Sequence, residues 1–126
     1  MGDAVPHVLI VGAGDTGLSL ATMLSSAGLR VSTLNRSGRS IDAATALVGD
    51  LADSASLMGL PSADVVVFTT APPSRDDEGY RTAYLDGPQR LLDALPTEPA
   101  RAVLTSTTGV YGADDGRWVT ATTPPD

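Results

Sequence analysis

A glycine-rich segment near the N-terminus constrains the fold of this chain more than any other feature. Residues 12–17 are Gly-Ala-Gly-Asp-Thr-Gly, a GxGxxG pattern. They follow the short apolar run 8–11 and precede residues 15–29, where apolar side chains recur at helical spacing. A buried strand, a glycine turn and a helix are therefore expected in immediate succession.

Each glycine in such a turn has its own physical function. Gly12 permits a tight turn, Gly14 lets the backbone approach a pyrophosphate, and Gly17 lets the helix pack against the strand. The unpaired N–H groups of the first helical turn, at Asp15 and Thr16, would meet the phosphates at the positive end of the helix dipole. The pattern thus predicts a dinucleotide site; the alternative is a tight turn that binds nothing.

Apolar strands and amphipathic helices alternate along the rest of the chain. Further strands are expected at 30–35, 45–48, 64–70 and 102–106, and helices at 53–60 and 78–95. Continuous apolar strands are typical of a parallel sheet covered on both faces. Right-handed crossovers then predict a doubly wound α/β sheet, a Rossmann fold, with five strands ordered 3-2-1-4-5.

Two details of this organisation are also predicted. Pro88 either kinks the 78–95 helix or restarts it after a break at Gly87. Residues 1–112 are expected to form one dinucleotide-binding domain, and residues 113–126 an extended tail or linker toward a C-terminal half that this chain does not contain.

Composition excludes several classes of partner. The chain has 126 residues, a net charge of −7 and no cysteine, which argues against nucleic acid as a partner and excludes disulfides. The single histidine, His7, is expected at the surface, and no histidine metal cluster is possible. No apolar run is long enough to cross a membrane, and the cytoplasm is the expected location.

The end of the second strand bears on which cofactor binds. A site for NAD usually places an acid there to accept hydrogen bonds from the ribose 2′-hydroxyl. Here Asn35 and Arg36 occupy that position, and no acid follows before Asp42. Arg36 could pair with the 2′-phosphate of NADP, so NADP(H) is predicted over NAD(H); the alternative is a solvated loop arginine.

Two later strand ends should complete the cofactor site. Asp50 could accept a hydrogen bond from the adenine amino group with Leu51 packed beside it, or it could simply cap the following turn. Thr70 and Ala71 follow the fourth strand and are small enough to leave room for the second ribose. All four residues are therefore included in the predicted cofactor site.

With these elements placed, the chain resembles the N-terminal part of the extended short-chain dehydrogenase/reductase superfamily. It is most similar to the NAD(P)-dependent epimerase/dehydratase-like branch, particularly its atypical members with GxGxxG. Besides the glycine turn, the resemblance rests on Gly49-Asp50-Leu51, on residues 84–92 and 106–112, and on the tail at 116–125. It covers essentially the whole chain.

The resemblance implies a soluble oxidoreductase or epimerase in which Thr107 hydrogen-bonds the oxygen of a small-molecule substrate. Family members usually add a Tyr-x-x-x-Lys pair on the next helix, where the lysine lowers the tyrosine pKa. All eight basic residues of this chain are arginines, so the pair is not present in it. Tyr84, Gly87-Pro88 and Ala121 also depart from the usual residues, and Tyr111 is expected to anchor its loop rather than replace the proton donor.

Two functions follow from these observations. The first is the NADP(H)-binding portion of an epimerase-like or reductase-like oxidoreductase, catalytically incomplete as given. The second is a dinucleotide-binding module without catalysis, such as a redox sensor or a subunit. Strand 102–106 would leave an apolar edge, which either the rest of a protein of about twice this length or a second copy in a homodimer would cover.

Overall fold

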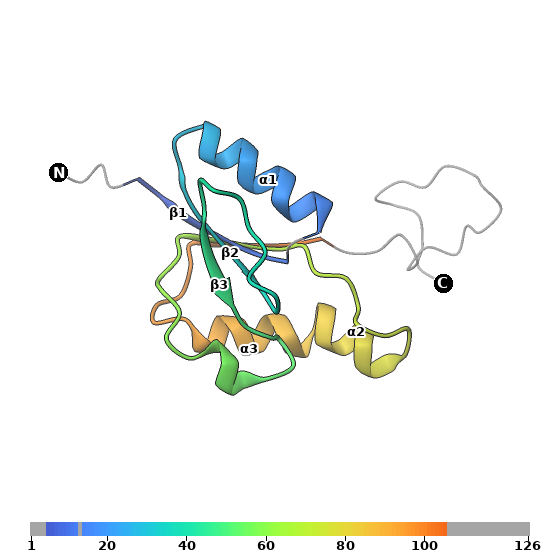
Figure 1. Cartoon of the computed structure of the whole chain (residues 1–126). Coiled ribbons are helices and arrows are strands. Elements are labelled where there is room, and N and C mark those ends of the chain that lie inside the picture. The colour runs from blue at the N-terminus through green and yellow to red at the C-terminus, as the bar shows by residue number, and fades with distance from the viewer. Residues whose placement is uncertain (1–4, 13, 106–126) are drawn as a thin grey trace, which may run out of the picture.

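The computed structural model describes residues 5–12 and 14–105, and these form one five-stranded parallel sheet. The strands are β1 (His7–Val11), β2 (Arg30–Asn35), β3 (Thr45–Val48), β4 (Val65–Phe68) and β5 (Arg101–Leu104). Their order is β3-β2-β1-β4-β5, and every neighbouring pair is parallel. The predicted doubly wound Rossmann sheet is therefore confirmed (Figure 1).

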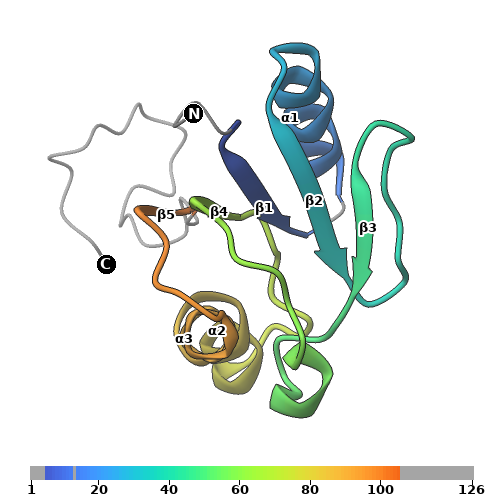
Figure 2. The same cartoon turned by 90° about the vertical axis from the view of Figure 1, so that its left-hand side faces the viewer.

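Helices cover both faces of this sheet. The helix α1 (Asp15–Ser26) covers one face, and α2 (Asp77–Tyr84), α3 (Asp86–Ala94) and the short 3-10 helix η1 (Ser54–Leu57) lie on the other (Figures 1 and 2). In the part of the chain that the structure describes, no helix is long and apolar enough to cross a membrane.

Alternate side chains of β1 enter two separate apolar clusters, as the two-residue period of a strand requires. Leu9 and Val11 pack on the side of α3 with Phe68 and Leu91. Val8 and Ile10 pack on the opposite side beneath α1, and this second cluster includes Ala21 and Val31. The central strand is thus buried on both faces, as a continuous apolar run predicts.

The segment predicted as one helix over 78–95 is two helices. The chain breaks at Leu85 (φ −128°, ψ −75°), which ends α2 and precedes α3. Pro88 lies in the first turn of α3, where its missing N–H leaves no hydrogen bond unmade. The break predicted at Gly87 therefore occurs two residues earlier in the chain.

His7 is buried, so its predicted surface position was wrong. The imidazole Nδ1 lies 2.6 Å from the carbonyl oxygen of Ser62, and Nε2 lies 2.7 Å from Ser32 Oγ. Since a carbonyl can only accept, Nδ1 donates to Ser62 and Nε2 can accept from the Ser32 hydroxyl. These partners satisfy the ring inside the protein and allow a histidine to be only 8% exposed.

The apolar edge predicted at the fifth strand is present. β5 pairs with β4 alone among the described residues, and Val103 and Leu104 remain 48% and 43% exposed. Association of two copies through this edge stays a prediction.

Candidate functional site

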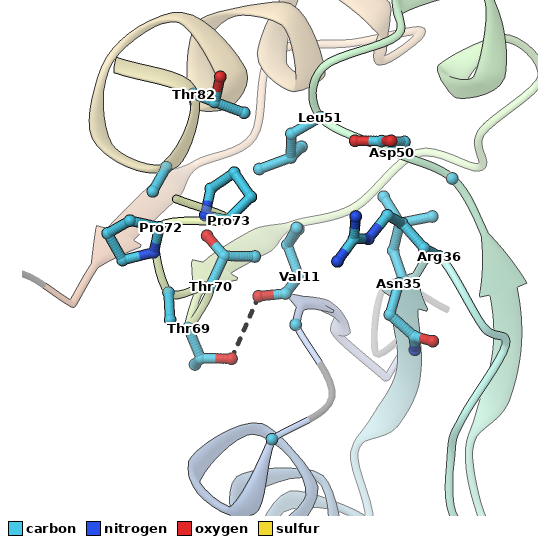
Figure 3. Close-up of a pocket in the computed structure, with 16 residues that line it drawn as sticks. Val11, Asn35, Arg36, Asp50, Leu51, Thr69, Thr70, Pro72, Pro73 and Thr82 are labelled. Carbon is cyan, nitrogen blue, oxygen red and sulfur yellow. Dashed lines mark hydrogen bonds between the residues drawn. The ribbon is translucent and has the colours of Figure 1, made fainter. Parts of the chain in front are cut away.

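A pocket of about 490 Å³ opens at the carboxyl ends of the first four strands (Figure 3). This edge of a parallel sheet is where ligands of doubly wound folds bind. The lining comes from the strand ends and the loops that follow them, with α2 on one side: Val11, Gly12, Gly14, Leu34, Asn35, Arg36, Gly49, Asp50, Leu51, Thr69, Thr70, Ala71, Pro72, Pro73, Thr82 and Ala83. Most of the residues predicted to bind a cofactor therefore surround one cavity.

The glycine turn is packed too closely for side chains at two of its positions. Gly12 has φ +116°, and a β-carbon there would lie 2.6 Å from Thr69 Oγ1. A β-carbon at Gly17 would lie 2.6 Å from the carbonyl oxygen of Gly12 and 2.8 Å from Thr69 Oγ1. Both glycines are required by contacts within the protein itself.

Gly14 differs, because a β-carbon there would have no atom within 4 Å. It is the N-cap of α1, with extended backbone and no side chain bonded to the helix start. Unpaired N–H groups of the first turn are thus left for an anion beside an open backbone. Asp15, Thr16 and Gly17 lie in that first turn and are not among the residues that line the cavity.

Arg36 directs its guanidinium into the pocket toward Val11 (Figure 3). Within residues 5–12 and 14–105, it has no hydrogen-bond or ion-pair partner. An unpaired guanidinium in a cavity wall can form charge-assisted, bidentate bonds with a phosphate.

Asn35 also lines the pocket, but its amide extends away from the Arg36 guanidinium (Figure 3). Its Oδ1 accepts from Ser37 N at 3.1 Å, Ser37 Oγ at 3.0 Å and Arg39 N at 2.9 Å. Its Nδ2 donates to the Arg39 carbonyl at 2.7 Å. The side chain is therefore bonded to its own loop.

Asp50 caps a turn and also lines the pocket. Its Oδ1 accepts from Ala52 N at 2.9 Å, so the alternative of a turn cap is confirmed, and its place in the pocket wall is compatible with the other role as well. The neighbouring Leu51 is buried, and Arg90 Nη1 donates to its carbonyl oxygen at 3.0 Å. This contact from α3 was missed by the sequence analysis, since a separation of 39 residues gives no local signal.

The end of β4 supplies three consecutive small residues to the pocket. Thr69 Oγ1 donates to the Val11 carbonyl at 3.1 Å and so joins β4 to β1. Thr70 and Ala71 also line the cavity, and their contact with the second ribose stays a prediction. Thr70 Oγ1 is buried with no hydrogen-bond partner in the described structure. A buried hydroxyl without a partner in a pocket wall can bond a polar group of a ligand.

Thr82 and Ala83 line the pocket from the C-terminal end of α2, whose start is capped. Asp76 caps this helix by accepting from Gly79 N at 2.8 Å, and Ser74 Oγ donates to it at 2.6 Å. The Ser74 hydroxyl and then the Gly79 N–H hold the pKa of the Asp76 carboxyl below its usual value.

Thr107 and Tyr111 lie outside the described residues, as do the tail and its Ala121. The substrate-polarising role of Thr107 therefore stays a prediction. Within the described ranges, no group of three or more histidine, aspartate or glutamate side chains could hold a metal ion.

The strand order, the glycine turn and the cavity at the switch between β1 and β4 define a Rossmann domain of the dinucleotide-binding class. A family model described as an FAD binding domain matches residues 6–50. No curated protein matches the sequence significantly.

Solved structures similar to this chain include a protein described as an NAD-dependent epimerase/dehydratase from Methylobacillus flagellatus. It is 29% identical with a TM-score of 0.75, over 97% of this chain and 44% of that one. A protein described as an epimerase from Burkholderia cenocepacia is 25% identical with a TM-score of 0.75, over 96% and 44% of the two chains. MoeE5 in complex with UDP-glucose and NAD is 27% identical with a TM-score of 0.66, over 95% and 42%.

These matches confirm the resemblance to the Rossmann portion of epimerase/dehydratase-like proteins. The chain spans less than half the length of each of these three structures.

Proposed function

We propose that this chain binds NADP(H) and forms the cofactor-binding portion of an epimerase-like or reductase-like oxidoreductase. The observation that carries the proposal is the Arg36 guanidinium, which lines the pocket without a partner among the described residues. No carboxylate occupies the end of β2, where an NAD site usually has one. NADP(H) would supply or accept a hydride when bound.

The residues present fit this cofactor. The open backbone at Gly14 and the uncapped start of α1 would hold the pyrophosphate. Arg36 would pair with the 2′-phosphate, and Asp50 and Leu51 would border the adenine. Thr70 and Ala71 would border the second ribose, where the buried Thr70 hydroxyl could form a hydrogen bond. Thr107 would donate a hydrogen bond to a substrate carbonyl or hydroxyl.

Binding titrations with NADPH, NADH and FAD test the proposal. A charge-assisted bond is worth about 1.5–3 kcal/mol, so Arg36→Ala should weaken NADPH binding roughly ten- to a hundredfold and leave NADH binding unchanged. Arg101→Ala is the matched control, because it removes the same charge at the opposite end of the sheet, where β5 begins. Equal or tighter binding of NADH or FAD by the unaltered chain would overturn the cofactor assignment.

The alternative is a dinucleotide-binding module that performs no chemistry, favoured by the absence of lysine from these 126 residues. An assay of the chain with NADPH and a panel of carbonyl compounds tests this alternative. Turnover that is lost in Thr107→Ala would reject the module without catalysis.

A further inference from the structure

Asn35 and Arg36 are adjacent in the chain, but their side chains extend in different directions from the pocket wall. The Arg36 guanidinium enters the cavity, whereas the Asn35 amide turns toward its own loop (Figure 3). A residue at the end of the second strand commonly contacts the adenosine ribose directly. In this chain its hydrogen bonds are directed elsewhere.

The amide of Asn35 closes the loop over 36–39 from both sides. Three donors from Ser37 and Arg39 converge on Oδ1, and Nδ2 donates to the Arg39 carbonyl. The partners fix which end of the amide is oxygen, because the Ser37 and Arg39 N–H groups need an acceptor and the carbonyl needs a donor. Such bonds to nearby backbone are how asparagine organises turns.

Contacts with β2 and β3 hold the rest of the loop in place. Gly38 has φ +76°, and a β-carbon there would lie 3.2 Å from Val48 Cγ2 on β3. At the exit, the hydroxyl of the buried Thr33 donates to Ser40 Oγ at 2.6 Å. The backbone from which the Arg36 side chain extends is therefore set by contacts on both sides of that residue.

Asparagine performs this function without charge. An aspartate could accept the same three hydrogen bonds, but it could not donate the fourth to the Arg39 carbonyl. Its carboxylate would also lie beside the residue that we expect to bind a phosphate. Two anions close together repel, and the repulsion is stronger near a protein surface than in bulk water. A neutral amide avoids this cost.

We propose that Asn35 is a positioning residue for cofactor choice. It closes the 36–39 loop so that Arg36 faces a 2′-phosphate, and it makes no contact with the cofactor itself. The inference rests on the proposed function, because it assigns a role within the same NADP(H) site.

A double-mutant cycle tests this inference. Dissociation constants for NADPH and NADH are measured by calorimetry for the unaltered chain, Asn35→Ala, Arg36→Ala and the double variant. Asn35→Ala should weaken NADPH binding about three- to tenfold and change NADH binding less than about twofold. In the Arg36→Ala background, Asn35→Ala should have no further effect on NADPH.

Asn35→Asp supplies the second arm. It replaces the Nδ2 donor to the Arg39 carbonyl with an acceptor, so it should lower the thermal stability. It should weaken NADPH binding more than NADH binding, and more at low salt than at high salt. If Asn35→Ala does not fold, Asn35→Ser replaces it in the cycle, because the serine hydroxyl can still accept a hydrogen bond from the loop.

The outcomes separate the two proposals. The proposed function stands if the unaltered chain prefers NADPH and Arg36→Ala removes that preference. The positioning role is nevertheless wrong if Asn35→Ala has no effect on NADPH binding, or has the same effect with and without Arg36→Ala. Equal weakening of NADPH and NADH by Asn35→Ala would also overturn the positioning role. A chain that binds NADH as tightly as NADPH would overturn the proposed function itself.

Discussion

The hydroxyl of Thr69 donates a hydrogen bond of 3.1 Å to the backbone carbonyl of Val11 (Figure 3). The bond joins the residue after β4 to the last residue of β1. From this position the Thr69 hydroxyl occupies the space that β-carbons at Gly12 and Gly17 would need. The shape of the glycine turn therefore depends on β4, which is distant in sequence.

Gly17 and Gly14 should respond differently to alanine. Gly17→Ala places a β-carbon 2.6 Å from the Gly12 carbonyl oxygen, and overpacking of this kind costs about 1–3 kcal/mol. Gly14→Ala meets no protein atom, so it should leave unfolding nearly unchanged while its methyl group blocks the pyrophosphate. Urea denaturation and NADPH titration of both variants measure the difference. Loss of stability in Gly14→Ala with intact binding would contradict this assignment.

Thr69 is expected to act on the cofactor through the turn. Thr69→Val keeps the shape of the side chain and removes the hydroxyl, so it should lower the free energy of unfolding by about 0.5–1.5 kcal/mol. The Val11 carbonyl retains its bond from Thr69 N. Thr69→Ser is the control that keeps the hydroxyl. If the valine and serine variants have the same free energy of unfolding and the same NADPH affinity, the Thr69 hydroxyl has no role.

Local sequence signals predicted the sheet and eight of the sixteen residues that line the pocket, because those signals lie within a few residues of each other. The glycine turn, the apolar run of β4 and the missing acid after β2 are all of this kind. The direction of the Asn35 amide was not predictable, since the same side chain could either contact a ligand or bond its own loop, and the folded structure has the loop bonds. The burial of His7 depends on Ser32 and Ser62, which only the folded sheet brings to it.

His7 should matter for stability and not for binding. Replacement by alanine leaves the buried Ser32 hydroxyl without its partner, a loss of about 1–3 kcal/mol, and also removes the bond to the Ser62 carbonyl. His7 begins β1, whereas the pocket lies at the other end of that strand. His7→Ala should therefore lower the midpoint of urea denaturation and leave the NADPH dissociation constant unchanged below that midpoint. A change in affinity in folded protein would contradict this separation.

The Asp76 cap should be sensitive to acid. The pKa of its carboxyl is lowered, first by the Ser74 hydroxyl and then by the Gly79 N–H. A group with a lowered pKa stabilises the folded state fully above its unfolded pKa, and this contribution is lost as the pH falls through the lowered folded value. NMR titration should give an Asp76 midpoint below that of an unstructured aspartate, and Ser74→Ala should raise it. An unshifted midpoint in the unaltered chain would show that the cap does not persist in solution.

Arg90 provides a contrast with Arg36, because it supports the pocket from outside. Its guanidinium donates to the Leu51 carbonyl at 3.0 Å, and Leu51 forms part of the wall where we expect the adenine. Arg90→Met keeps a long side chain and removes the donor, so the Leu51 loop should be held less firmly. NADPH and NADH share the adenine, and both should bind a few-fold more weakly, by about 0.5–1.5 kcal/mol, with their affinity ratio unchanged. Calorimetric titration with both nucleotides checks this, and a change in the ratio would mean that Arg90 acts on the 2′-phosphate side instead.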